Sequence, residues 1–583
     1  MKKFLKNVLS TIIGVISSII VLSIILIGFV AFLSPEKQVK VIENSILKID
    51  LSSTAVVERR ATNPFDALNM SGELTQSLEI KEVLDNIEKA KNDINIKAIY
   101  LNNQNIKAGL SQTEEIRNKL LEFKTTGKPI IAYSEVYSQA SYYLASVANN
   151  IYLNPEGIIE LKGLSISPMF YKGLLEKLDI DMQIIRHGKF KSAVEPFTLD
   201  KMSKSNREQM TLFLNSIANN IMDSISSQRG LSLSQIQRHA DKLILENAKI
   251  CLELNYVDAL LYQDQINDSL LAISGSEKLN FISLNKYTDV IVKKKDISRN
   301  KIAIIYATGT INSGEGDENS IGSETTAKAI KDAREDKNVK AIVFRINSGG
   351  GSALASDVIW RETILTKKAK KPIVVSMGDY AASGGYYIAC AADSIVANPT
   401  TLTGSIGVFG MVPNLQNFYK NKLGITIDTV NTNKSADMGT NRPLTNYERN
   451  KIQKSVSHIY NGFIAKVGDG RRMNTINVDE IGEGRIWSGY DAKLIGLIDT
   501  YGGIEKAIDI ASSLANVEEY RVISLPKKKD PLQELLGSLG SSVNISNIIM
   551  QKIGFKTELI DPVESLLNAD KIQARLPFLI KLK

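Results

Sequence analysis

The chain has 583 residues, of which 43% are hydrophobic and 23% are charged. This composition excludes an intrinsically disordered protein, and the length is sufficient for two domains that each bury a core. The formal net charge is +8, but basic and acidic residues are interspersed and no basic helix with interleaved aromatic residues occurs, which argues against nucleic-acid binding. The two cysteines, Cys251 and Cys390, have neither metal-binding nor redox spacing. We expect two small buried residues, with a single disulfide as the alternative.

The N-terminal sequence predicts a membrane anchor. Lys2, Lys3 and Lys6 precede an uncharged stretch over residues 7–35, within which residues 12–33 are almost entirely apolar. About 20 such residues span a bilayer core as a helix, and the lysines predict a cytoplasmic N-terminus with the rest of the chain exported. A cleaved signal peptide is the alternative. The apolar run is longer than a typical signal core, so we expect a retained anchor and linker over residues 1–45.

Strand and helix patterns alternate after the anchor. Residues 46–51 predict a strand, and residues 54–75 predict an irregular exposed loop. The pattern then predicts helices over residues 78–92, 113–123 and 140–148, with buried strands over residues 98–101 and 129–133. Strands that alternate with helices indicate an α/β fold with a parallel sheet built from βαβ units.

The chain repeats itself with an offset of 243 residues. Residues 87–99 align with residues 330–342 without a gap, and seven positions are identical. The match continues at Asn154-Pro155 and Asn398-Pro399, one residue further apart. A period this long indicates a duplicated domain rather than a solenoid repeat. We expect two repeats, over residues 46–290 and 300–525, and a tail over residues 526–583 that has no counterpart in the first repeat.

The two repeats differ where chemistry could occur. The second repeat reads Asn347-Ser-Gly-Gly-Gly-Ser352 after a predicted strand, and Thr403-Gly-Ser405-Ile-Gly407 after a turn. The first repeat lacks this glycine-rich loop, and Leu161 stands at the position of Ser405. The loop has neither dinucleotide-binding nor P-loop spacing, but its N–H groups could hold the oxyanion of an acyl-transfer intermediate. Either feature alone is more typical of an ordinary turn than of a catalytic site, whereas their joint loss suggests one functional unit.

A nucleophilic serine requires a base, and histidine is the usual one. The chain has three histidines, of which His187 is the best candidate; the others are His239 and His458. Both of these lie on predicted surface helices. A lysine can act instead if burial keeps its amine neutral near pH 7.

The segment over residues 186–197 is a place where a lysine could be buried. Lys191 is followed there by small and apolar residues. Lys189 would face the same way in an extended chain, so alternation does not distinguish the two. The trio Lys191-Ser-Ala recurs as Lys434-Ser-Ala in the second repeat, which favours Lys191 over Lys189 but makes Lys434 a competitor.

Four motifs carry a family resemblance. They are Gly188-Lys-Phe-Lys-Ser-Ala-Val-Glu-Pro-Phe197, Asn347-Ser-Gly-Gly-Gly-Ser352, Ala382-Ser-Gly-Gly-Tyr-Tyr387 and Thr403-Gly-Ser-Ile-Gly-Val-Phe-Gly410. Together they resemble the signal peptide peptidase A (protease IV) family, in its long, two-repeat, membrane-anchored form. The resemblance covers residues 1–525 and implies two tandem ClpP/crotonase-like repeats with a Ser–Lys dyad formed between them.

Carried over residue by residue, the resemblance implies that Ser405 is the nucleophile and Lys191 the general base. Backbone N–H groups of Gly350, Gly351 and Ile406 would then form the oxyanion hole.

Two further positions qualify this assignment. The family commonly has proline where Gly349 stands, and glycine can adopt the backbone angles of proline, so the turn should survive while the identity of the oxyanion donor stays open. Asp379-Tyr-Ala-Ala-Ser383-Gly resembles the serine position of ClpP-type peptidases. Those enzymes need a histidine further along the chain, and this sequence has none at that place, so we expect Ser383 to pack a helix start instead.

The resemblance implies a membrane-anchored serine endopeptidase that degrades remnant signal peptides, with no cofactor, metal or nucleic acid. It also implies a homotetramer in the bacterial inner membrane, with the catalytic repeats on the periplasmic side. The alternatives are a crotonase-type acyl-CoA enzyme, because a fold does not fix a reaction, and a catalytically inactive membrane scaffold. The predicted anchor and the presence of both Ser405 and Lys191 argue against them.

Overall fold

The computed structural model describes residues 39–60, 76–290, 298–317, 319–528 and 572–576, together with residues 7, 11–15 and 17–18. Most of the predicted anchor over residues 12–33 lies outside these described residues. Within the part that the structure describes, no helix is both long and apolar enough to cross a bilayer. The anchor and its topology therefore stay predictions.

The first repeat is built on a parallel sheet of six strands in the order β8-β6-β5-β4-β1-β9. Helices cross over between its strands because parallel neighbours cannot be joined by a tight turn. The elements are β1 (Ser45–Ile49), β4 (Ile96–Leu101), β5 (Ile130–Tyr137), β6 (Asn150–Ile159), β8 (Ala259–Leu260), β9 (Phe281–Ser283), α2 (Ile80–Asn92), α3 (Leu110–Lys124) and α4 (Gln139–Ala145). These strands and helices confirm the predicted α/β alternation.

One expectation about this part of the chain is wrong, and the expectation for the two cysteines is confirmed. Residues 54–57 form a strand, β2 (Thr54–Val57), and Glu58 after it is buried, so the beginning of the predicted exposed loop is instead part of the core. Residues 61–75 of that loop lie outside the described residues. Cys251 and Cys390 are both free and buried, which excludes the alternative of a disulfide between them.

The second repeat has the same strand order as the first. Its sheet contains the path β21-β10-β13-β15-β16-β20, which corresponds strand for strand to β9-β1-β4-β5-β6-β8. Two further strands, β17 and β19, extend the sheet beside β15. The strands are β10 (Lys301–Thr308), β13 (Val339–Ser348), β15 (Ile373–Ala382), β16 (Ser394–Ala397), β17 (Leu402–Gly404), β19 (Ile486–Ser488), β20 (Thr500–Tyr501) and β21 (Arg521–Leu525).

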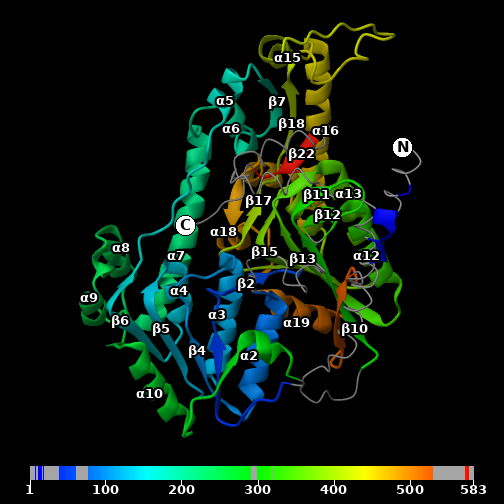
Figure 1. Cartoon of the computed structure of the whole chain (residues 1–583). Coiled ribbons are helices and arrows are strands. Elements are labelled where there is room, and N and C mark those ends of the chain that lie inside the picture. The colour runs from blue at the N-terminus through cyan, green and yellow to red at the C-terminus, as the bar shows by residue number, and fades with distance from the viewer. Residues whose placement is uncertain are drawn as a thin grey trace.

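One of the apolar cores contains residues from both repeats. Alternate residues of β10 face opposite sides of its sheet. Ile302 and Ile304 join the core of the first repeat, whereas Ala303 and Ile305 pack beneath α12 (Ser323–Glu335) and α13 (Ala353–Lys368). Figure 1 shows α2 and α3 beside α19 (Ile504–Leu514), between the two sheets. The repeats are therefore fused into one body rather than tethered by a linker.

A third sheet combines both repeats with the C-terminal tail. Its order is β12-β11-β14-β22-β18-β7. The first repeat contributes β7 (Asp181–His187), which pairs antiparallel with β18 (Val408–Asn414) over seven residues. The tail contributes β22 (Ile572–Arg575), and the second repeat contributes β11 (Thr310–Asn312), β12 (Ser320–Gly322) and β14 (Gly350–Ser352). The pairing of β7 with β18 directs the segment that contains Lys191 toward the second repeat.

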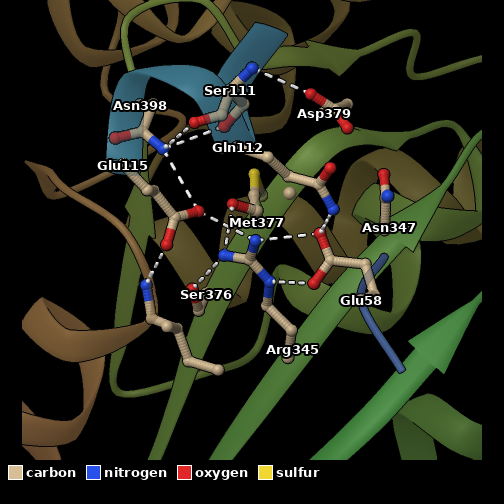
Figure 2. A network of polar contacts seen from close by, with 12 residues as sticks. Glu58, Ser111, Gln112, Glu115, Arg345, Asn347, Ser376, Met377, Asp379 and Asn398 are labelled. Carbon is tan, nitrogen blue, oxygen red and sulfur yellow. Dashed lines mark hydrogen bonds and ion pairs between the residues drawn. The ribbon is translucent and has the colours of Figure 1, made fainter. Parts of the chain in front are cut away.

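A buried ionic network also joins the repeats (Figure 2). The Arg345 guanidinium of β13 donates to the Glu58 carboxylate at 2.7 and 2.9 Å and to Glu115 Oε1 at 2.8 Å. All three side chains are almost completely buried. Nearby, the backbone N–H of Ser111 donates to Asp379 Oδ1 at 2.8 Å, and burial raises the pKa of Asp379 to about 6. Arginine serves here because its planar group can donate to two carboxylates at once.

Candidate active site

Lys191 reaches the second repeat by a path that glycine residues leave open. The chain leaves β7, turns at Gly188 with φ of 94°, and enters the short helix η1 (Ser192–Val194). A Cβ atom on Gly484 would lie 2.7 Å from Cβ of Lys191, and one on Gly407 would lie 3.1 Å from its Cδ. The lysine stem therefore fits because these two positions have no side chain, and only 1% of Lys191 is exposed.

A buried amide fixes the lysine segment to the second repeat. The Gln209 side chain, from α7 (Lys204–Arg229), donates to the Phe190 carbonyl at 3.0 Å and accepts from the Ile486 N–H at 3.2 Å. Phe190 directly precedes Lys191, and Ile486 begins β19. Gln209 thus connects the lysine segment to the strand beside β17, and this limits the positions that the Lys191 amine can adopt.

The Lys191 amine lies between two serine hydroxyls. Its Nζ is 2.7 Å from Ser383 Oγ and 3.1 Å from Ser405 Oγ, with the Ser405 carbonyl oxygen at 3.4 Å. Loss of hydration around the ammonium lowers the pKa of Lys191 from 10.5 to about 7. The amine therefore has a neutral form near physiological pH and could accept a proton from either hydroxyl.

The two serines occupy different backbone settings. Ser383 stands at the sharp turn between β15 and α14 (Gly384–Ala389), with φ of 56° and ψ of −115°, and its N–H donates to the Gly404 carbonyl. Ser405 follows β17, with φ of 49°, and its N–H donates to the Arg485 carbonyl. Left-handed backbone angles are unfavourable for serine and persist where the surrounding structure imposes them, often at functional sites.

The structure brings the predicted pair together and adds a residue that sequence reasoning missed. Lys191 and Ser405 are within hydrogen-bond distance, although they come from different repeats. Ser383, which was expected only to pack a helix start, is closer to the same amine. The signal was present in its similarity to the ClpP-type serine position. The sequence argues against this role because no histidine follows Ser383, whereas the structure places the Lys191 amine of the first repeat beside it.

The competing bases lie elsewhere. Lys189 is 64% exposed and forms an ion pair with Glu483 at 3.2 Å. Lys434 is exposed, in the segment that follows α15 (Gln416–Lys422). His187 ends β7 and stacks on the Tyr460 ring, with centroids 4.0 Å apart. Within the described residues, no hydrogen bond connects His187 to either serine, so the geometry favours Lys191 as the base.

The glycine-rich loop borders the same serine turn. Gly350 has φ of 96°, and a Cβ atom on it would lie 2.6 Å from the Gly384 nitrogen. The Gly350 N–H, a predicted oxyanion donor, donates to Ser348 Oγ at 3.1 Å in this state. Gly351 and Ile406 are the other two predicted oxyanion donors. Gly351 lies in β14, and the carbonyl of Ile406 accepts a hydrogen bond from the Gly484 N–H at 2.7 Å. The loop therefore lies against the residue that directly follows Ser383.

The sequence is similar to peptidases along most of its length. The model of peptidase family S49 matches residues 122–273 and 366–518, one segment in each repeat. Protease 4 from Salmonella typhi is 36% identical over 512 residues, which cover 85% of this chain and 82% of that protein. The chloroplastic serine protease SPPA from Arabidopsis thaliana is 33% identical over 523 residues, covering 87% and 75%. A putative signal peptide peptidase SppA from Enterococcus faecium is 34% identical over 253 residues, covering 42% and 72%.

Proposed function

The chain belongs to peptidase family S49 and is a serine-type peptidase, and we propose that Lys191 is the general base of its peptide-bond hydrolysis. The observation that carries this proposal is the buried Lys191 amine, within 3.1 Å of two serine hydroxyls. Lysine acts as a base only when neutral, and burial supplies that state near physiological pH.

We propose Ser383 as the attacking residue, in place of the Ser405 expected from sequence. Three features support this choice. Ser383 Oγ is closer to the amine, at 2.7 Å against 3.1 Å. Ser383 stands at a strand–turn–helix junction, the setting that exposes the nucleophile in other serine hydrolases. Gly384 and the Gly350 region adjoin it, and their backbone could supply oxyanion donors.

In this proposal, neutral Lys191 removes the Ser383 proton as Oγ attacks the substrate carbonyl carbon. The oxyanion forms against the backbone of the glycine-rich loop and the start of α14. The lysine ammonium then protonates the departing amine, which leaves an acyl-enzyme. The neutral lysine next activates water, and hydrolysis of the ester frees Ser383. Ser405 holds the amine toward Ser383 through its own hydroxyl and is thus a positioning residue.

The test compares three variants, Ser383→Ala, Ser405→Ala and Lys191→Ala, by peptide hydrolysis and by labelling with a fluorophosphonate. We expect Ser383→Ala to abolish labelling, and Lys191→Ala to lower hydrolysis by about 10³-fold or more. Ser405→Ala should keep the label on Ser383 but shift the pH–rate profile, and Ser405→Thr should restore that profile. Labelling that survives in Ser383→Ala and disappears in Ser405→Ala would return the nucleophile to Ser405, as the sequence resemblance implies.

We propose that the substrates are remnant signal peptides at a membrane. Two points support this proposal: the apolar run over residues 12–33 preceded by lysines, and a relative named as a putative signal peptide peptidase. Incubation of detergent-solubilised protein with a cleaved signal peptide and with a polar peptide of equal length tests it. Equal turnover of both would argue for a general peptidase. The homotetramer is a further prediction, which light scattering of the solubilised protein checks.

A further inference from the structure

The C-terminal tail fills a slot that is one strand wide. On one side of β22 lie β11 and β14, and on the other lie β18 and β7. β22 is antiparallel to both neighbours: Gly351 faces Ala574 on one side, and Phe409 faces Gln573 on the other. Figure 1 shows the red β22 beside β18 in this sheet. Without β22, two strand edges from the second repeat would face each other across the slot with unpaired backbone groups.

The slot passes beside the glycine-rich loop and the residue that directly follows Ser383. A Cβ atom on Gly350 would lie 2.1 Å from the Ala574 carbonyl oxygen, and one on Gly384 would lie 3.0 Å from it. One peptide carbonyl of the tail is therefore packed between the glycine-rich loop and the residue that follows Ser383. Two residues beyond Ala574, the Leu576 N–H donates to the Gly349 carbonyl at 2.7 Å.

The buried side chains of β22 indicate which residue types the slot accepts. Ala574 is fully buried, and Leu576 on the same side of the strand is only 5% exposed. Leu576 packs on Gly349, where an added Cβ would approach it to 3.3 Å. Main-chain pairing supplies affinity for any extended peptide, and pockets for alternate side chains supply specificity. The slot thus accepts a small residue beside the serine and an apolar residue two positions later.

We infer that β22 is a resident occupant of the substrate groove, bound as a substrate strand would be, and that it competes with peptide substrates. This inference rests on the proposed function for its assay, because the groove is placed at Ser383. Only the fraction of molecules with an empty groove can bind substrate. If the tail occupies the groove in about nine-tenths of the molecules, the apparent affinity for substrate falls about tenfold.

The test replaces the two buried tail residues singly, Ala574→Asp and Leu576→Asp, in the full chain. Each change places a charge at a buried position and should release the strand. We expect KM for a short peptide to fall about tenfold, with kcat within about twofold. Val430→Asp, at a position that is 99% exposed, is the matched control and should not change KM. A synthetic peptide of residues 570–578 should inhibit Ala574→Asp competitively. Intact mass spectrometry verifies that the tail is present in every sample.

Unchanged KM in both tail variants, with no inhibition by the peptide, would overturn the inference. A binding measurement separates this failure from failure of the proposed function. Fluorescein-labelled peptide 570–578 is titrated into Ser383→Ala and into Ser383→Ala/Ala574→Asp, and anisotropy is recorded. Tighter binding by the second protein supports the inference even if no form hydrolyses peptides. Equal binding by the two proteins refutes it.

Discussion

Replacement of Lys191 by methionine should make the protein more stable while removing its activity. The reason is that burial without a counter-charge disfavours the ammonium, so folding must either pay for desolvation or release a proton. The difference between the ordinary pKa of 10.5 and the folded value of about 7 corresponds to about 4 kcal/mol at pH 7. Methionine also loses hydrogen bonds to two serines, at about 1 kcal/mol each, which leaves a net gain of about 2 kcal/mol.

The stability advantage of the methionine variant should decrease as pH rises. Between pH 7 and 10.5 the unfolded chain keeps the lysine proton, whereas the folded chain has released it. The parent therefore gains stability as pH rises, by about 1.4 kcal/mol per pH unit, and the methionine variant lacks this increment. The advantage of Lys191→Met should thus be largest at pH 7 and below, and a net gain of about 2 kcal/mol should be lost by about pH 9.

Urea unfolding at pH 7, 8 and 9 measures this difference. The fluorescence of Trp360 and Trp487 reports on the second repeat, in which the lysine is buried. Lys189→Met is the matched control, because Lys189 is 64% exposed and only two residues away. If Lys191→Met and Lys189→Met differ from the parent by the same amount at every pH, the Lys191 amine is hydrated in the folded protein and the reasoning is wrong.

Four further outcomes are expected. Peptide hydrolysis should rise with pH along one ionisation near 7, as Lys191 loses its proton, and this ionisation should persist in His187→Gln; its loss there would indicate a Ser–His site. Lys434→Ala should keep most of the activity in the same assay, because Lys434 is exposed, and inactivity would contradict the pairing across the repeats. Arg345→Ala should lower the free energy of unfolding by about 3 to 5 kcal/mol in urea, since it leaves the Glu58 and Glu115 carboxylates buried without a counter-charge; an unchanged midpoint would refute this. Protease added to intact spheroplasts should digest both repeats, and protection would contradict the predicted export.

The sequence alone determined the local and repetitive features of this protein. Strand and helix periodicity predicted β1, α2, β4 and α3, because these elements bury one face and their apolar spacing records it. The offset of 243 residues predicted two repeats, and the matched strand orders bear that out. The lysine motif over residues 186–197 could be identified from the sequence because a run of small and apolar residues follows Lys191 and predicts its burial.

Only the tertiary structure decided which groups meet. Lys191 and Ser383 are 192 positions apart, and the chain between them gives no sign that a β7–β18 pairing will bring them together. The sequence predicts an exposed loop at Glu58, because its buried partner Arg345 is 287 positions away and leaves no mark on the local pattern. The tail strand likewise shows no periodic pattern of its own. Long-range pairings of this kind depend on two distant segments at once, so the sequence of neither segment predicts the contact. The contact between Lys191 and Ser383 could therefore be identified only once the tertiary structure was known.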